Sequence, residues 1–303
     1  MPLLGPTRTG DTKPAQIVPA QRKKRGIFAV CANPVCSSGW LRPLRSRSTP
    51  VFEGSWTCSA ECTRAVVRAA ILRERSGCAA EGHGAARPVH RHRIPLGLLM
   101  LQQGWLTHRQ LRAALDAQRQ AKTGRIGDWL VRQRVLSEET VTRALALQWS
   151  CPVMSVDGHD AEVMSAILPR LFVDAFTALP LRVSGNKMLY LGFENAPDPV
   201  LALGISRMTG LSVECGIVME ARFRATHAQM MAASFPAATL IEAVSESAAT
   251  WTFAKEIERV RPLASRLIRM HDYLWLRMWT CKQTGVLPKP EGVHDLICSI
   301  GPI

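Results

Sequence analysis

Residues 95–118 read PLGLLMLQQGWLTHRQLRAALDAQ, and residues 125–148, thirty positions further along the chain, read RIGDWLVRQRVLSEETVTRALALQ. Six positions are identical in the two segments, among them the glycine pair Gly97 and Gly127. Self-similarity at a fixed offset is typical of a structural repeat. Within each copy, apolar residues recur at the three- and four-residue spacing of amphipathic helices. The sequence therefore predicts a tandem repeat of one helical unit.

Each copy is predicted to form a helix, a turn and a second helix. Gly104 suits the left-handed residue that ends a helix, and Thr107 with Gln110 has the spacing of a capping box at the start of the next helix. In the second copy, Ser137 and the two glutamates that follow it mark the equivalent helix start. Four such helices can bury their apolar faces against one another. On its own this pattern predicts a fold but no function.

The order of residues in the two copies resembles a known family. Two tandem copies of Arg-Leu-Gly-x-x-Leu-Leu-x-x-Gly-x-Leu-x4-Leu-x3-Leu-x2-Gln are the pattern of the MshEN family, the cyclic-di-GMP-binding N-terminal domain of type II secretion and type IV pilus assembly ATPases. The resemblance covers residues 95–148 strongly and continues more weakly through 161–235. It implies a ligand site in which each copy holds one half of the dinucleotide. The residues at the corresponding positions are Leu96, Gly97, Met100, Leu101 and Gln118 in the first copy, and Arg125, Ile126, Gly127, Leu130, Val131 and Gln148 in the second.

These residue types suit a dinucleotide, with two departures from the family pattern. Glycines would let the backbone approach a phosphodiester, an arginine plane can stack on a purine, and aliphatic side chains desolvate its ring. Pro95 stands where the family has arginine, and Arg134 stands where it has glycine. Loss of one charged hydrogen-bonding partner costs about 1.5–3 kcal/mol. Arg93 lies close enough along the chain to substitute for the missing arginine. In the alternative interpretation, the leucines and glutamines serve packing and helix contacts only.

Four of the nine cysteines stand in two close pairs, Cys31 with Cys36 and Cys58 with Cys62. Tetrahedral zinc takes four ligands, and short spacings let one turn or one helix end present two sulfurs to the same ion. Ser59 is placed to cap a helix that begins at the second pair, whose positive end would favour thiolates. The arrangement resembles a treble-clef module and predicts a structural zinc on these four cysteines. Thiols in a module without metal are the alternative.

The charge of the chain is concentrated at one end. The formal net charge is +14, and residues 1–93 hold 16 Lys and Arg against 5 Asp and Glu, whereas residues 94–303 hold 22 against 19. A basic segment of this kind attracts nucleic acid, anionic lipid or an acidic protein surface. Neither a secretory signal nor an apolar run long enough to cross a bilayer is visible in the sequence. We therefore expect a cytoplasmic protein without a transmembrane segment.

The chain as a whole is predicted to be an α+β protein with a small four-cysteine zinc module, a tandem helical-hairpin repeat, a small mixed sheet with helices, and C-terminal helices. The block 151–235 has the order β-β-α-β-α. The apolar stretch 267–279 is predicted to be helical, with Trp275 and Trp279 on one face. The predicted divisions are a disordered basic tail (1–30), the zinc module (31–75), a linker (76–93), the tandem repeat (94–150), an α/β subdomain (151–235), and a C-terminal helical segment and tail (236–303).

No catalytic motif is visible in the sequence. The phosphate-binding Gly-x4-Gly-Lys-Ser/Thr loop of the secretion ATPases does not occur. The sequence thus predicts a non-enzymatic regulatory or adaptor protein, with cyclic-di-GMP as the candidate ligand and a protein as a further partner. The alternative is a zinc-containing regulator that binds nucleic acid through the basic N-terminal region. The second helix of each repeat copy carries few basic residues, which weighs against this alternative.

Overall fold

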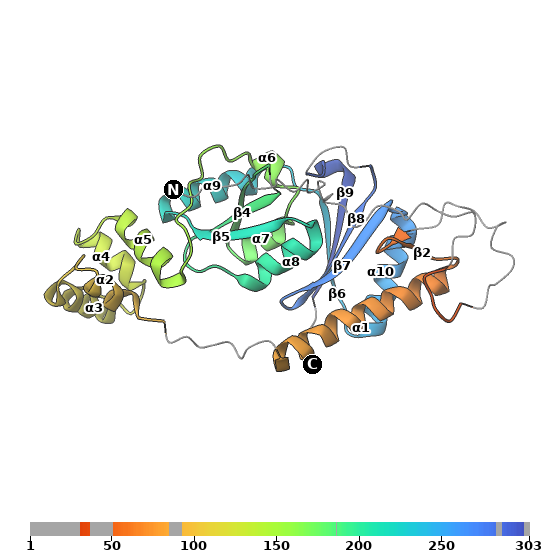
Figure 1. The fold of residues 1–303 in the computed structure, drawn as a ribbon, viewed down its shortest axis with the longest axis horizontal. Helices are drawn as coiled ribbons and strands as arrows, with labels where there is room; N and C mark the ends of the chain where they lie inside the picture. The colour runs from red at the N-terminus through yellow and green to blue at the C-terminus, as the bar shows by residue number, and fades with distance from the viewer. Residues whose placement is uncertain (1–30, 37–50, 85–92, 186, 283–286, 300–303) are drawn as a thin grey trace, which may run out of the picture.

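The computed structural model of the protein describes residues 31–36, 51–84, 93–185, 187–282 and 287–299. The predicted disordered tail, 1–30, lies outside these ranges. Figure 1 shows three blocks in a row: the tandem repeat at one end, a three-stranded sheet with its helices in the middle, and a four-stranded sheet beside two long helices at the other end. The predicted α+β class is confirmed. No helix within the described ranges is long and apolar enough to cross a membrane.

The tandem repeat consists of two helical hairpins, as predicted. Gly104 has a positive φ of 70° after the first helix. The backbone N–H of Gln110 donates to Oγ1 of Thr107, and the N–H of Thr107 donates to Oε1 of Gln110, which forms the predicted capping box. Ser137 accepts from the N–H of Thr140 at the matching start. The four helices are α2 (Leu96–Gln102), α3 (His108–Ala121), α4 (Ile126–Arg132) and α5 (Glu138–Trp149).

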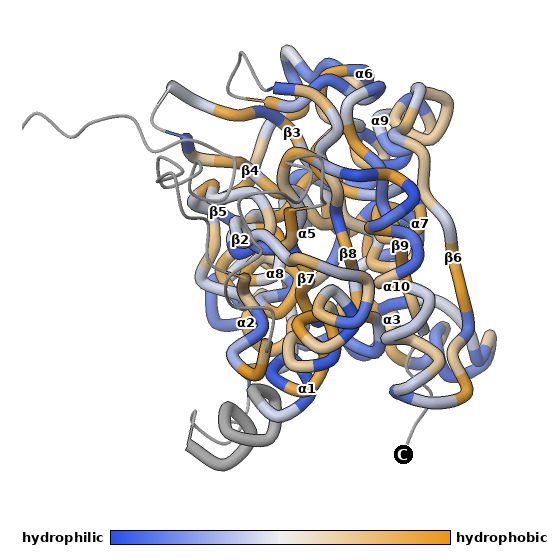
Figure 2. Tube along the Cα trace, turned by 90° about the vertical axis from the view of Figure 1, so that its right-hand side faces the viewer, coloured by the Kyte–Doolittle hydropathy of each residue, from blue (hydrophilic) through white to orange (hydrophobic). Residues whose placement is uncertain are grey.

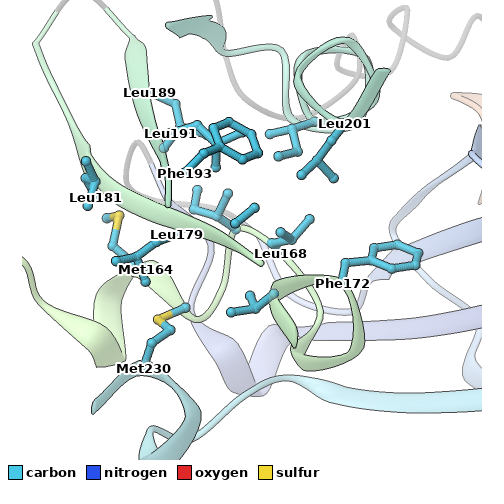
Figure 3. Close-up of a cluster of buried hydrophobic side chains, with 14 of the residues drawn as sticks. Met164, Leu168, Phe172, Leu179, Leu181, Leu189, Leu191, Phe193, Leu201 and Met230 are labelled. Carbon is cyan, nitrogen blue, oxygen red and sulfur yellow. The ribbon is translucent and has the colours of Figure 1, made fainter. Parts of the chain in front are cut away.

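The middle block has the predicted order of two strands, a helix, a strand and a helix. Strands β3 and β4 pair antiparallel, whereas β4 and β5 run parallel because α8 crosses between them. Figure 3 shows the buried side chains of this block gathered between the sheet and its helices. Its elements are α6 (Ala161–Met164), α7 (Arg170–Ala175), β3 (Ala178–Val183), β4 (Met188–Phe193), α8 (Pro199–Thr209), β5 (Ser212–Ile217) and α9 (Glu220–Ala232).

The C-terminal block corrects the prediction of a helical segment over 236–303, because a single α-helix and four strands occupy its described part. The sheet has the order β6-β9-β8-β7, with β6 at its outer edge (Figure 2). A 3-10 turn, Pro290–Gly292, precedes the last strand. The elements are β6 (Ala237–Glu242), α10 (Glu246–Val260), β7 (Ala264–Met270), β8 (Tyr273–Trp279) and β9 (Val293–Ser299).

The helix predicted over 267–279 is absent because this stretch forms parts of strands β7 and β8. Along β8, Leu274, Leu276 and Met278 belong to one core cluster, and Trp275 and Trp279 belong to another. A strand that is buried on both faces is continuously apolar, so its periodicity does not distinguish it from a buried helix. The two tryptophans do share a face, through the two-residue period of a strand.

The N-terminal module contains a two-stranded hairpin and one long helix. Strands β1 (Val51–Phe52) and β2 (Ser55–Trp56) precede α1 (Ala60–Gly84). The predicted linker over 76–93 is therefore wrong in its first half, because α1 continues to Gly84; residues 85–92 lie outside the described ranges. Glycines weaken a helix but do not end it where the preceding turns are held by packing. In Figure 1, α1 runs beside α10 along the four-stranded sheet.

Candidate functional site

The two repeat copies are joined by reciprocal hydrogen bonds. The side-chain amide of Gln118 donates to the carbonyl of Gly124, 2.8 Å away, just before the second copy begins. The amide of Gln148 donates to the carbonyl of Ile94, also 2.8 Å away, just before the first copy begins. Ile94 and Gly124 are thirty positions apart and therefore equivalent in the repeat. The two glutamines thus hold the starts of the two copies in matching positions.

The repeat glycines have a packing role. A Cβ atom on Gly97 would lie 2.7 Å from Cδ1 of Leu111, and one on Gly127 would lie 2.8 Å from Cγ1 of Val141. Leu111 and Val141 are equivalent residues on the second helix of each copy. The glycines therefore let the two helices of a hairpin approach closely. Their predicted approach to a phosphodiester stays a prediction. Met100 and Leu130 are likewise buried in the bundle core.

The start of the second copy faces a cavity of about 330 Å³. Leu96 of the first copy lines it together with Arg125 and Val131 of the second, and the backbone of Gly127 is also part of the wall. Val141 and Leu145 of α5 extend the apolar side of the lining. The other side belongs to the α/β subdomain. Leu101, Ile126, Gln118 and Gln148 lie outside this lining, so the structure brings only some of the predicted ligand residues together.

Arg125 is the charged centre of this cavity. Its guanidinium lies 2.8 Å from a carboxylate oxygen of Glu220 and 3.1 Å from one of Glu194, contacts the side chain of Asn195, and also pairs with Asp128. Burial alone would lower the pKa of Arg125, but the hydrogen bond and charge of Asp128 and the charges of the two glutamates raise it above its ordinary value. All three guanidinium nitrogens have a partner: Nε donates to Asp128, Nη1 to Asn195 and Nη2 to both glutamates. The side chain as a whole is 41% exposed.

The carboxylates that surround Arg125 are not predicted by any pattern in the sequence. Arg224 bridges Glu194 and Glu220, with closest N···O distances of 3.6 Å and 2.5 Å. Glu138, at the start of α5, accepts from the backbone N–H of Ala221 at 2.6 Å and so caps α9. These acidic side chains come from α5, the end of β4 and the start of α9. In the sequence they are isolated glutamates, and no spacing rule connects them to Arg125.

Arg134, one of the two departures from the family pattern, and Arg93, the candidate substitute for the arginine missing at Pro95, have different surroundings. Arg134 has a positive φ of 55°, like Gly104 at the equivalent position of the first copy. The left-handed turn is therefore kept, at the strain that a side chain adds there. The guanidinium of Arg93 lies 3.2 Å from the ring centroid of Trp149. Arg93 thus stacks on the end of α5.

The four predicted metal ligands come together in space. The sulfur atoms of Cys31, Cys36, Cys58 and Cys62 all lie within 4.8 Å of one another. Cys58 Sγ is 3.4 Å from Cys36 Sγ and 3.6 Å from Cys62 Sγ. A tetrahedron with zinc–sulfur bonds of about 2.3 Å has edges of about 3.8 Å. The cluster therefore fits a tetrahedral thiolate site, and four cysteine ligands leave no coordination position for a substrate.

Local hydrogen bonds hold this cluster in shape. The amide of Asn33 donates to Cys62 Sγ at 3.3 Å, an outer contact typical of metal thiolates. Ser59 accepts from the N–H of Cys62 and caps α1 as predicted. The N–H of Ala32 donates to the carbonyl of Trp56, which joins the first cysteine pair to β2. Burial raises the pKa of the Cys31 thiol to about 11, so metal binding must displace its proton.

Comparison with known proteins gives partial similarities. No family model matches the chain. The chain is 29% identical over 126 residues to bacteriophage adsorption protein B of Escherichia coli (strain K12) and to bacteriophage N4 adsorption protein B of Escherichia coli O157:H7, which is 41% of this chain and 16% of each relative. A solved structure of MshE with cdg is 26% identical, with a TM-score of 0.37 over 46% of this chain and 99% of that one. The N-terminal domain of XpsE is 17% identical, with a TM-score of 0.33 over 45% of this chain and 92% of that one. The chain thus spans about a sixth of the length of the curated relatives, and the resemblance to the MshEN family stays a prediction.

Proposed function

We propose that this chain is a non-enzymatic regulatory or adaptor protein that binds cyclic-di-GMP at the cavity between its tandem repeat and its α/β subdomain. The observation that carries the proposal is the convergence of Leu96 from the first copy and Arg125 from the second on one cavity. A volume of about 330 Å³ lies at the lower end of the range for small-molecule sites. It suits one base of a dinucleotide, with the rest of the ligand outside the cavity along the exposed part of the Arg125 side chain.

The lining of the cavity suits guanine. Val131, Val141 and Leu145 offer an aliphatic wall for the face of a purine. The Watson–Crick edge of guanine carries two adjacent donors, N1–H and the amino group, and a carboxylate such as Glu194 accepts from both. Adenine has an acceptor at N1 and would meet the carboxylate unfavourably. A guanidinium can donate to guanine O6 and N7, as it does in nucleic-acid recognition. We therefore expect cyclic-di-GMP to bind in preference to cyclic-di-AMP.

The first copy offers a weaker half-site. Pro95 supplies no cation, and Arg93 is stacked on Trp149. One missing charged hydrogen bond lowers affinity roughly tenfold to a hundredfold. We therefore propose one strong half-site and one that depends on apolar contacts.

The proposal includes a structural zinc ion on the four cysteines. It would cross-link the segment 31–36 to β2 and to the first turn of α1, where the positive end of the helix stabilises the doubly negative centre.

The alternative, a nucleic-acid-binding regulator, rests on the charge of residues 1–93. The described residues of that region hold five Lys and Arg against four Asp and Glu, so most of its positive charge lies outside the described ranges. Binding measurements with the dinucleotide and with duplex DNA separate the two functions. A steep dependence of duplex DNA binding on salt, without a response to the dinucleotide, would favour the alternative.

Isothermal titration calorimetry at near-physiological salt tests the proposal. We expect heat with cyclic-di-GMP, loss of that heat in Arg125→Ala, and retention in Arg143→Ala, where an exposed arginine of the same bundle pairs with Glu139 on its own helix. Glu194→Gln should reduce the preference for guanine over adenine. Absence of heat at a protein concentration of about 100 μM would mean affinity too weak for a sensor, and the proposal would then reduce to an adaptor without this ligand.

A further inference from the structure

We infer that metal occupancy of the cysteine cluster controls the integrity of the C-terminal four-stranded sheet, because α1 is a covering layer of that sheet. The inference rests on the proposed zinc ion. It assigns to that ion a role roughly 200 residues away in the sequence. The predicted zinc module (31–75) is then part of a composite unit. The unit is built from residues 51–76, 237–282 and 287–299.

The apolar face of α1 is buried against this sheet. Val67, Ala70 and Ile71 are at most 2% exposed. They belong to one core cluster with α10 and with the inner face of the sheet. Phe52 of β1 is buried in the same cluster. Their neighbours there include Phe253, Ile257, Leu274, Leu276 and Leu296.

The hairpin before α1 also joins the sheet. Ser265 of β7 donates through its hydroxyl to the carbonyl of Val51 at 3.0 Å, and its own carbonyl accepts from the N–H of Glu53 at 3.1 Å. These bonds satisfy backbone groups at the edge formed by β7. The N-terminal hairpin therefore protects one edge of the C-terminal sheet.

A buried carboxylate fixes the middle of α1. Glu74 accepts from the guanidinium of Arg207 on α8 at 2.7 Å and from the backbone N–H of Arg269 on β7 at 3.1 Å. Its side chain is 3% exposed. Since these partners belong to two different blocks, α1 connects the C-terminal sheet to the α/β subdomain.

The cysteine cluster lies where this layer begins. Cys58 joins β2 to α1, and Cys62 lies in the first turn of the helix. In the segment 31–36 only Cys31 is buried, and Val35 is 86% exposed, so a bound metal would replace a core there. Loss of the cross-link frees β1 and the start of α1 together. Because both cover the sheet, the strands beneath them become accessible to water.

Hydrogen exchange on the full chain tests this inference, with zinc content measured in parallel. We expect the amides of β8 and β9 to exchange at least about tenfold faster after chelation than with zinc bound, while the amides of α3 and α5 keep their rates. Cys36→Ser should have the same effect as chelation. Cys281→Ser is the matched control, because it removes an exposed cysteine outside the cluster and should change neither zinc content nor exchange.

A second variant distinguishes the effect of metal loss from the effect of disturbing the packing of α1 on the sheet. Val67→Asp places a charge on the buried face of α1 and leaves all four ligands in place. We expect faster exchange in β8 and β9 with one equivalent of zinc still bound. Unchanged exchange in these strands after chelation, or slow exchange in a chain that contains no metal, would overturn the inference. Zinc content and calorimetry with cyclic-di-GMP report on the proposed function separately, so its failure is distinguishable from that of the coupling.

Discussion

The ion pair between Arg277 and Asp295 offers the sharpest test of how the four-stranded sheet is attached to the α/β subdomain. The Arg277 side chain is 1% exposed and forms two parallel bonds of 2.8 Å with the carboxylate of Asp295. It also donates to the carbonyls of Ala166 and Ile167, at 2.8 and 2.9 Å, in the α/β subdomain. The indole N–H of Trp275 is a further donor to Asp295. The guanidinium thus connects strands β8 and β9 to the segment between α6 and α7.

Asp295→Asn keeps the shape of this side chain but leaves a buried cation without its counter-ion. Removing one partner of a buried pair costs about 3–5 kcal/mol. At about 2–4 °C per kcal/mol for a protein of this size, the unfolding midpoint should fall by roughly 6–20 °C. Thermal unfolding followed by circular dichroism measures this shift. Arg143→Ala, at an exposed pair on α5, should change stability by less than about 1 kcal/mol. A loss below about 1 kcal/mol for Asp295→Asn would refute the assignment of Arg277 as a connection between the four-stranded sheet and the segment between α6 and α7.

Three further changes test individual parts of the fold. Arg134→Gly should raise stability by about 1–2 kcal/mol, because it removes a side chain from a left-handed residue; an unchanged unfolding midpoint would contradict this. Gly127→Ala should cost about 1–3 kcal/mol in urea unfolding, since the added methyl meets Val141; a neutral result would mean that the two helices can separate freely. Burial alone would raise the pKa of Glu74, but bonds from Arg207 and the Arg269 N–H lower it below its ordinary 4.5. Its stabilising contribution is therefore present above about pH 4.5 and is lost as pH falls through the lower folded-state pKa. Stability measured against pH should fall less steeply in Glu74→Gln over that acid window, and an equal slope would contradict this role.

The parts of the fold that the sequence predicts well are those set by neighbouring residues. The capping box of Thr107 and Gln110 acts over three residues, and both partners are visible in the sequence. The strands β3 and β4 follow the predicted order of the block 151–235, because two short apolar runs are separated by a tight turn. The approach of the four cysteines is also well predicted, since their short spacings reflect the geometry that a single ion requires.

The parts that the sequence does not predict depend on contacts between distant segments. Leu276 and Trp275 face different layers of the protein, and no local pattern shows that both layers exist. The role of Gly97 is set by Leu111 on another helix, so a glycine that serves packing looks the same in the sequence as one that serves a ligand. Glu220 lies 95 residues from Arg125, and only the fold brings the two side chains together.

We propose above all that the two repeat copies present one cyclic-di-GMP site at the cavity around Arg125. Nuclear magnetic resonance of the full chain, titrated with cyclic-di-GMP, tests it most directly. We expect the largest shifts at the Arg125 side-chain Nε–H, at the methyl groups of Leu96 and Val131, and at the backbone N–H of Ala221 opposite them. Unchanged resonances at these four positions, whether or not signals elsewhere respond, would contradict the account.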